Sequence, residues 1–264
     1  MPFAHIGDLD VYYERAGAGP PLLFISGTGG DLRRRPNALD GPFPRTFDTL
    51  AYDQRGLGRT TKPDAPCTMA DYADDAARMI DFAGWERANV VGYSFGGMVA
   101  QELALRHPRK VRRLALAATS PGGAGGASFP FHEVGLTGED LVRHMIPIAD
   151  TRRDAAWAAA NPAEYAAQVA MAADPFAGEP GRADGARRQL EARSGHDTWE
   201  RLDGIACPVL IAGGRHDGIA PRDRQEAMAG RIPGARLRLF DGGHMFMMQD
   251  PAALPAIIAF LSED

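Results

Sequence analysis

A serine stands between two glycines in the stretch 90–97, where an apolar run gives way to a helical one. Gly92 comes two places before Ser94, and Gly96 comes two places after it. The spacing has a steric cause, because a serine at a sharp strand-to-helix turn has a strained backbone whose close neighbours cannot carry a Cβ. Such a turn exposes the hydroxyl and leaves the N–H of Phe95 facing a developing negative charge. The stretch therefore predicts a nucleophilic serine at residue 94.

A serine hydroxyl is a poor nucleophile unless a base takes its proton and an acid orients that base. Asp217 lies in a glycine-rich loop after a strand predicted over 208–212, and His244 lies in a loop after a strand predicted over 235–240. Both loops are expected at the sheet edge that also carries Ser94, where ligands bind in open α/β sheets. The chain order Ser, Asp, His is one that catalytic triads adopt.

Neighbouring residues compete for the roles of acid and base. Asp241 shares a short loop with His244 and is an alternative acid, although turn formation alone would explain an aspartate there. His216 lies beside Asp217 and fits a pocket or surface position better than the position of the base. The remaining histidines do not follow a predicted strand: His5, His107, His132, His144 and His196.

An oxyanion hole for this serine needs two N–H donors. Phe95, directly after the nucleophile, supplies one, and the loop Gly27–Gly30 is expected to supply the other through Thr28. These glycines would make a tight turn whether or not they also donate. Three apolar side chains flank the predicted catalytic positions and are candidates to line an acyl pocket, with core packing an equal alternative for the first: Met98, Met245 and Phe246.

Strand-like and helix-like segments alternate along most of the chain. Two short alternating segments between residues 3 and 15 predict antiparallel strands, and continuous apolar runs predict strands buried on both faces. The buried strands are expected at 22–26, 47–52, 89–93, 111–118, 208–212 and 235–240. Helices are expected at 68–83, 96–106, 222–229 and 251–261. This order predicts an α/β fold with a doubly wound, mostly parallel sheet.

The alternation breaks once, after a glycine-rich run at 121–127, and a helical stretch rich in alanine and arginine follows from about 137 to 202. We expect residues 1–120 and 204–264 to form the core domain and residues 121–203 to form an inserted helical lid. Most large apolar side chains of the insertion are expected to form its own core: Phe129, Phe131, Met145, Ile146, Trp157, Tyr165, Met171 and Phe176.

The composition excludes several classes of partner. The 264 residues carry a formal net charge of −5 with both signs interspersed, so there is no electrostatic case for nucleic acid or an anionic membrane. The cluster Arg33–Arg35 is expected in a solvated loop, with a clamp for a substrate carboxylate as the alternative. Cys67 and Cys207 form no C-x-x-C pair, so neither a disulfide framework nor a zinc knuckle is predicted.

The N-terminal residues lack the basic start and apolar stretch of a signal peptide, and no run reaches membrane-spanning length. We therefore expect a soluble, cytoplasmic protein that acts on a small molecule. The sequence does not define its oligomeric state.

Together these motifs resemble the α/β-hydrolase superfamily over nearly the whole chain. The matching stretches are 92–97, 53–58, 214–217 with Pro221, and 242–244. The resemblance implies an eight-stranded, mostly parallel sheet, a helical cap between strands six and seven, and no cofactor. The family usually has His-Gly at the oxyanion turn, whereas this chain has Ser26-Gly27, a turn similar to that of some enol-lactonases and related small-ester hydrolases. A serine at position 94 argues against haloalkane dehalogenase and epoxide hydrolase relatives, which place an aspartate there.

The combined interpretation is a serine hydrolase of carboxylic esters or lactones that works through an acyl-enzyme. One alternative is different chemistry on the same scaffold, by a lyase, a cofactor-free oxygenase or a perhydrolase. A non-catalytic small-molecule receptor is a third class, which an intact set of Ser94, Asp217 and His244 disfavours. The acyl group, the alcohol and the choice between open ester and lactone are left open, because the cap sets them.

Overall fold

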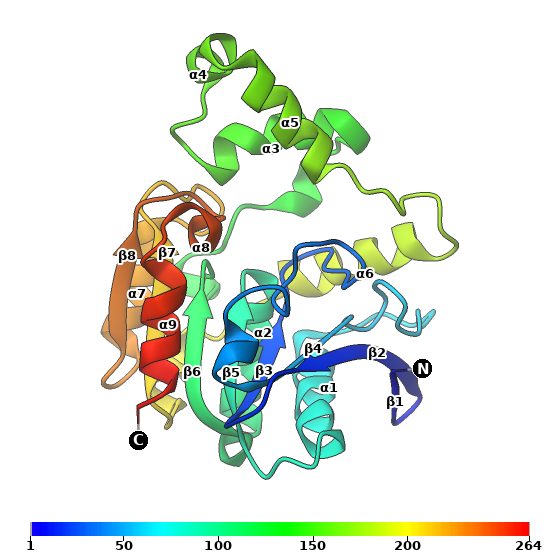
Figure 1. The fold of residues 1–264 in the computed structure, drawn as a ribbon, viewed down its shortest axis with the longest axis vertical. Helices are drawn as coiled ribbons and strands as arrows, with labels where there is room; N and C mark the ends of the chain where they lie inside the picture. Colours follow the sequence, from blue (N-terminus) through cyan, green and yellow to red (C-terminus); the bar gives the residue numbers. More distant parts are fainter. Residues whose placement is uncertain (1, 264) are drawn as a thin grey trace.

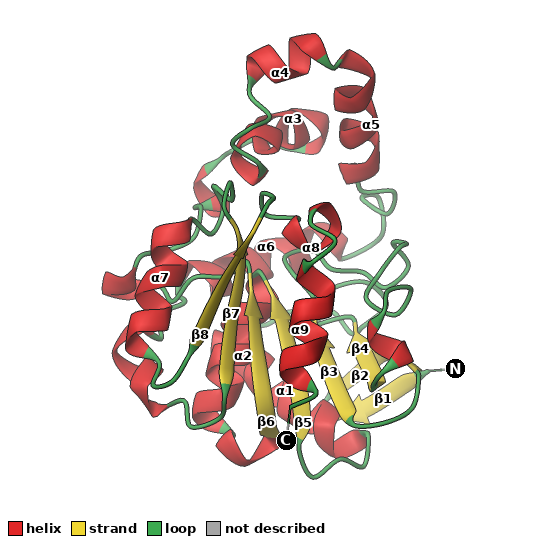
Figure 2. Cartoon of the chain, turned by 60° about the vertical axis from the view of Figure 1, so that its left-hand side comes forward, coloured by secondary structure: helices red, strands yellow, loops and turns green. Residues whose placement is uncertain are grey.

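A central sheet with helices on both faces forms the body of the protein, in a computed structural model that describes residues 2–263 (Figures 1 and 2). Its strands are β1 (Phe3–Ile6), β2 (Leu9–Ala16), β3 (Pro21–Ile25), β4 (Asp48–Tyr52), β5 (Ala88–Tyr93), β6 (Val111–Ala117), β7 (Val209–Gly214) and β8 (Arg236–Phe240). The eight strands lie in the order β1-β2-β4-β3-β5-β6-β7-β8. The pairs β1–β2 and β2–β4 are antiparallel, and all other neighbours are parallel. The eight-stranded, mostly parallel α/β fold is therefore confirmed.

Helices cover the two faces of the sheet because side chains alternate between them along each strand. The helices of the body are α1 (Met69–Phe82), α2 (Phe95–Arg106), α7 (Arg222–Arg231), α8 (Phe246–Gln249) and α9 (Ala253–Leu261). Leu23 and Ile25 of β3 belong to the cluster that includes α1, α2 and α7, whereas Leu22 and Phe24 belong to the cluster that includes α8 and α9. The buried strands begin and end within two residues of the predicted positions, whereas the short helix α8 was not predicted.

The chain between β6 and β7 forms a separate group of helices above one edge of the sheet (Figures 1 and 2). These helices are α3 (Gly138–Ala149), α4 (Ala155–Ala160), α5 (Pro162–Ala172) and α6 (Arg182–Ser194). Figure 1 shows α3, α4 and α5 standing apart from the body, whereas α6 lies directly over it. Gly122 and Asp197 form a bridge where the insertion leaves and rejoins the body. We refer to residues 121–203 as the cap.

The large apolar side chains of the cap do not form the core that we expected. Of those eight residues only Ile146 is buried, and Met171 is 64% exposed. Guanidinium groups cover the aromatic rings instead, which is a favourable contact between a cation and a π face. The pairs are Arg153 over Trp157, Arg143 over Tyr165, Arg33 over Phe176 and Arg193 over Phe131. Charged side chains therefore provide much of the packing of the cap.

A cluster of ion pairs fastens the cap to the loop that follows β3. The fully enclosed carboxylate of Asp31 accepts hydrogen bonds from Arg33 and Arg182, each at 2.8 Å. Arg33 also pairs with Glu179 at 2.6 Å, and Arg182 pairs with Asp174 at 2.5 Å. Burial acts to raise the pKa of Asp31, but the hydrogen bonds from the two arginines outweigh it and lower the pKa to about 2. The expectation of a solvated loop is therefore wrong for Arg33.

Replacement of Asp31 by asparagine leaves the buried guanidinium of Arg182 and the partly buried one of Arg33 short of a counter-charge. We expect Asp31→Asn to lower the free energy of unfolding at pH 7 by about 3 kcal/mol. Because the folded-state pKa of Asp31 lies below its ordinary value, the advantage of the wild type is complete above that value and declines as the pH falls towards 2. Urea unfolding between pH 2.5 and pH 7 measures it, with the exposed Asp64→Asn as control. An equal loss at both ends of this range would contradict the assigned role of the charge.

Candidate active site

The turn between β5 and α2 holds Ser94 in a strained backbone conformation, with φ +54° and ψ −116°. Two glycines make this turn possible. A Cβ on Gly92 would overlap the carbonyl of Gly96, and a Cβ on Gly96 would overlap the carbonyl of Ile25 at the end of β3. The N–H of Ser94 donates to the carbonyl of Ala117 at 2.8 Å, which fixes the turn against β6. Ser94 is thereby held at the carboxyl edge of the sheet.

Two side chains from the loops after β7 and β8 meet at this serine. Nε2 of His244 lies 2.9 Å from Oγ of Ser94, and Nδ1 of His244 lies 2.8 Å from Oδ2 of Asp217. The other carboxylate oxygen of Asp217 accepts the N–H groups of Ile219 and Ala220 at 2.8 and 2.9 Å. All three polar side chains are buried. The structure therefore brings together the three residues that were singled out from the sequence.

The competing acid and base lie elsewhere. The carboxylate of Asp241 belongs to a side chain that is 73% exposed, and it pairs with Arg152 at 2.9 Å. His216 lies 3.6 Å from the same carboxylate. Among the described residues, the carboxylate that bonds to the ring of His244 is that of Asp217.

The C-terminal end of α3 ties the acid loop and the base loop to the cap. The last carbonyls of a helix have no acceptor role within it and need partners from elsewhere. Here the carbonyl of Ala149 accepts the N–H of His244 at 2.6 Å, and the carbonyl of Ile148 accepts the N–H of Gly218 at 3.0 Å. Directly after the helix, the N–H of Thr151 donates to a carbonyl of the acid loop at 2.9 Å. One helix end therefore positions both loops.

The loop Gly27–Gly30 lies against the nucleophile, since a Cβ on Gly27 would stand 3.2 Å from Cβ of Ser94. In the described part of the chain, nothing accepts the N–H of Thr28. The N–H of Phe95 opens α2, where a helix provides no acceptor. Both candidate oxyanion donors are thus available on the two sides of Ser94.

The polar turn after β4 supports this loop. The side-chain amide of Gln54 donates to the carbonyl of Ser26 at 2.9 Å. Asp53 accepts the N–H of Leu32 at 2.7 Å, and burial raises the pKa of Asp53 to about 6. These two contacts pin the loop of the oxyanion turn at both of its ends.

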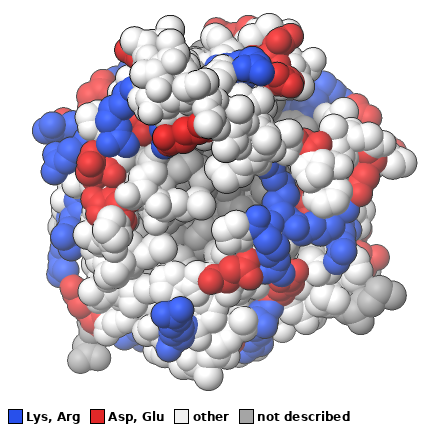
Figure 3. Space-filling model, turned by 45° about the horizontal axis from the view of Figure 1, so that its top comes forward, with Lys and Arg blue, Asp and Glu red and all other residues white. Residues whose placement is uncertain are grey.

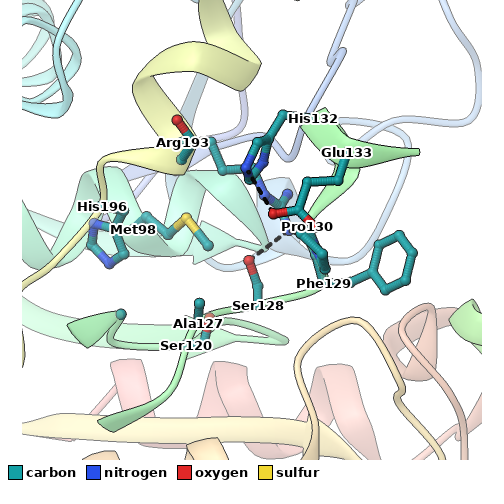
Figure 4. A pocket seen from close by; sticks show the side chains of 12 residues that line it. Met98, Ser120, Ala127, Ser128, Phe129, Pro130, His132, Glu133, Arg193 and His196 are labelled. Carbon is teal, nitrogen blue, oxygen red and sulfur yellow. Dashed lines mark hydrogen bonds and ion pairs between the residues drawn. The ribbon is translucent and has the colours of Figure 1, made fainter. Parts of the chain in front are cut away.

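A cavity of about 280 Å³ lies against α2, the helix that begins directly after Ser94 (Figure 4). Side chains from α2, from the segment after β6 and from α6 line it, including Met98, Ser128, Phe129 and Arg193. Figure 3, which looks onto the cap end of the molecule, shows the surface hollowed near its centre, with mostly uncharged atoms around the hollow and a group of Lys and Arg atoms along one side. The lining does not include Ser94 itself.

The predicted pocket residues divide between this cavity and other environments. Met98 is among the lining residues. Met245 is 41% exposed, and its sulfur accepts a hydrogen bond from the hydroxyl of Tyr93 at 2.9 Å. Phe246 is fully buried and stacks on Phe240, with ring centroids 5.4 Å apart. Phe246 is instead a core residue, because its side chain packs into the cluster that α8 and α9 form with one face of the sheet.

Two polar side chains of α6 contact the oxyanion turn, and the sequence did not point to either of them. Oε1 of Gln189 accepts the N–H of Gly29 at 2.8 Å, and Nη1 of Arg193 donates to Oγ1 of Thr28 at 2.8 Å. The two side chains are one helical turn apart and therefore share a face of α6. In the sequence, only this spacing of four residues indicates that the two side chains act together, because α6 is rich in arginine.

Further sequence-based expectations concern metals, thiols and membranes. Within residues 2–263, no three His, Cys, Asp or Glu side chains gather so that they could hold a metal ion. Cys67 and Cys207 are free thiols. No helix of the described chain is both long enough and apolar enough to cross a membrane.

A family model described as alpha/beta hydrolase fold matches residues 20–251. The chain belongs to the α/β hydrolase family. Within this family it is 31% identical to RutD of Azorhizobium caulinodans, a candidate carbamate hydrolase, over 95% of this chain and 94% of that protein. It is also 31% identical to the poly(3-hydroxyalkanoate) depolymerase of Ectopseudomonas oleovorans, over 92% of this chain and 85% of that protein.

Solved structures of α/β hydrolases share the fold along the full chain. The enol-lactonase from Burkholderia xenovorans LB400 superimposes with a TM-score of 0.81 at 25% identity, covering 99% of this chain and 100% of that one. The resemblance to the α/β-hydrolase superfamily is therefore confirmed, and the protein is an enzyme of that superfamily.

The contact of Gly96 with β3 can be tested by adding one methyl group. We expect Gly96→Ala to lower the free energy of unfolding by about 3 kcal/mol, since the new Cβ overlaps the carbonyl of Ile25. Gly230→Ala in α7 is the matched control, because nothing lies within 4 Å of a Cβ there. That variant should gain about 0.5–1 kcal/mol from the better helix former. Urea unfolding of both variants measures the difference, and equal stabilities would contradict the close approach.

Proposed function

We propose that this α/β hydrolase is a serine hydrolase that cleaves carboxylic ester or lactone bonds of a small molecule through an acyl-enzyme. The observation that carries the proposal is the hydrogen-bonded chain from Oγ of Ser94 through the ring of His244 to the carboxylate of Asp217. Such a chain makes an alcohol nucleophilic, because the imidazole accepts the proton as the oxygen attacks.

In the acylation step, the oxygen of Ser94 attacks the carbonyl carbon and its proton moves to Nε2 of His244. Asp217 accepts the N–H at Nδ1, so the ring is held in the tautomer whose Nε2 takes the proton, and the imidazolium that forms is stabilised. The N–H groups of Thr28 and Phe95 donate to the carbonyl oxygen as it becomes negative. One such donor typically contributes about 10²–10³ in rate.

In the next steps the imidazolium protonates the leaving alkoxide, and the ester C–O bond breaks. A water molecule then gives a proton to His244 and attacks the acyl carbon, which releases the acid and restores Ser94. In a lactone the alcohol stays attached to the acyl group, so hydrolysis releases one open-chain hydroxy acid. The overall reaction consumes one water molecule for each ester or lactone bond and needs no other reactant.

The relatives support this class of substrate. The neighbour from Burkholderia xenovorans is an enol-lactonase, which supports a lactone as the substrate of a site at the carboxyl edge of the same fold. RutD is a candidate carbamate hydrolase, so a carbamate belongs in any substrate panel beside esters and lactones. An acyl carbon bound to a heteroatom is common to all of these bonds.

The division of the chain into core and cap is part of the proposal. Residues 1–120 and 204–264 supply the triad and the oxyanion donors, and residues 121–203 cover them. The end of α3 holds the acid and base loops, and α6 contacts the oxyanion turn. The cap thereby limits the space and the water around the acyl carbon and selects the substrate.

Ser94→Ala removes the nucleophile while leaving the fold intact. We expect hydrolysis of p-nitrophenyl acetate to fall by at least about 10³-fold, given the losses seen when a triad serine is removed. Circular dichroism and the thermal midpoint should stay close to those of the wild type. Turnover at the wild-type rate in the folded variant would overturn the proposal.

The two candidate acids can be separated by a matched pair of variants. Asp217→Asn should lower kcat for the same ester by about 10⁴-fold, because an amide stabilises the wrong tautomer of His244 and cannot stabilise the imidazolium. Asp241→Asn removes an exposed carboxylate that pairs with Arg152, and kcat should change less than about threefold. Steady-state kinetics of both purified variants measure this. The reverse order of effects would assign the acid to residue 241.

A further inference from the structure

One buried arginine of this protein lacks a carboxylate partner. Three arginines are buried in the described chain: Arg113, Arg182 and Arg193. Arg182 pairs with two aspartates, and Arg113 pairs with Glu263 at 3.1 Å. No carboxylate of the described residues lies within ion-pair distance of Arg193. The chain thus neutralises two of its three buried guanidinium groups and leaves the third charged.

The partners of Arg193 are all neutral. Its Nη1 donates to Oγ1 of Thr28 at 2.8 Å, and its Nη2 donates to Oγ of Ser128 at 2.7 Å and to the carbonyl of Phe129 at 3.4 Å. The ring of Phe131 lies 4.5 Å from the guanidinium carbon. Burial lowers the pKa of Arg193 to about 10 against the opposing effect of the Asp217 carboxylate, so the group is still charged at neutral pH.

A buried guanidinium with no carboxylate at ion-pair distance is costly, because hydrogen bonds to neutral acceptors do not replace a counter-charge. A bound ligand with a negative charge would supply the counter-ion that Arg193 lacks. Space for such a ligand is present, since Arg193 lines the cavity against α2, where Figure 4 shows its guanidinium reaching Ser128.

The other charged groups of this cavity lie at its outer end. Glu133 and His132 face each other at 3.5 Å, and the side chain of Glu133 is 69% exposed. Water screens the exposed carboxylate of Glu133. The buried positive charge of Arg193 is therefore offset only by the carboxylate of Asp217, which acts on it from beyond ion-pair distance and is hydrogen-bonded to His244.

Two of the residues that line the cavity are also close in the structure or the sequence to the proposed reacting groups. Thr28, which accepts a hydrogen bond from Arg193, carries one of the proposed oxyanion donors on its own backbone. Met98 lines the cavity one helical turn after Ser94. A small molecule can therefore place an acyl carbon at Ser94 and another group at Arg193.

From this arrangement we infer that Arg193 binds a carboxylate of the substrate, so that the enzyme acts on small esters or lactones that are anions. This inference rests on the proposed function and narrows its substrate class. A planar guanidinium suits a carboxylate, because two parallel N–H groups meet two oxygens.

Two members of the arginine cluster that the sequence suggested as a carboxylate clamp already pair with carboxylates, and the third, Arg34, donates to the carbonyls of Met171 and Ala172. Arg33 pairs with Asp31 and Glu179, and Arg35 pairs with Glu14 and Asp40. The clamp is therefore assigned to Arg193, which contacts the oxyanion turn directly.

The test compares anionic and neutral substrates of matched shape. One pair carries the charge on the acyl side, monomethyl glutarate against dimethyl glutarate, and the other carries it on the alcohol side, 4-acetoxybenzoate against 4-acetoxybenzamide. For each pair the ratio of kcat/KM for the anion to kcat/KM for the neutral ester is measured in wild type, Arg193→Met and Arg193→Lys.

The wild type should prefer the anion of at least one pair, and Arg193→Met should lower that ratio at least tenfold, with Arg193→Lys in between. Equal losses for anion and neutral ester would show that Arg193 acts only by holding Thr28, and would overturn the inference.

If Arg193→Met does not fold, inhibition of the wild type decides: glutarate should compete with the neutral ester far better than glutaramide, and equal inhibition contradicts the inference. If the wild type cleaves no ester in a Ser94-dependent way, the proposed function itself has failed.

Discussion

The contact between the start of α2 and the end of β3 is the constraint on which the site depends. It brings backbone against backbone at Gly96 and Ile25, at a distance that no side chain on Gly96 would allow. Strain at a residue such as Ser94 costs about 1–3 kcal/mol and persists only where the surroundings enforce it. Here the parallel pairing of β5 with β3 and β6 enforces it on both sides. The same packing lays the Gly27–Gly30 turn beside the serine.

Parallel pairing also explains how three distant segments meet. The loops after β3, β5, β7 and β8 all leave the sheet at its carboxyl edge, so the proposed oxyanion turn, nucleophile, acid and base share one rim. The cap then holds this rim at two places. The end of α3 bonds to the loops of Asp217 and His244, and α6 bonds to the oxyanion turn through Gln189 and Arg193. A movement of the cap would therefore alter the catalytic geometry as well as the access to it.

Much of the body could be predicted because buried parallel strands appear in the sequence as continuous apolar runs. The same runs locate the strand ends, and these in turn selected Asp217 and His244 among many acids and histidines. The side-chain packing of the cap could not be predicted in the same way. Its aromatic rings lie under guanidinium groups such as that of Arg153, a contact that gives no periodic apolar pattern. Arg193 meets Thr28 across 165 residues of sequence, which spacing cannot show.

The position of Phe246 illustrates a different limit. It lies two residues after His244 in the sequence, yet α8 turns its ring onto Phe240 in the core. Proximity along the chain to a catalytic residue does not determine which way a side chain faces. The turn at Gly27–Gly30 shows the opposite case, because it was selected from its place after a strand and its first glycine lies against Ser94.

The central claim is that the oxygen of Ser94 becomes covalently acylated during turnover. The direct measurement mixes the wild-type enzyme with p-nitrophenyl acetate, quenches it with acid within one turnover, and maps the digested protein by mass spectrometry. We expect an acetyl group on the peptide that contains Ser94, appearing with the first release of nitrophenol and disappearing as the substrate is exhausted. Turnover of the ester with no acyl group on that peptide at any time would contradict it.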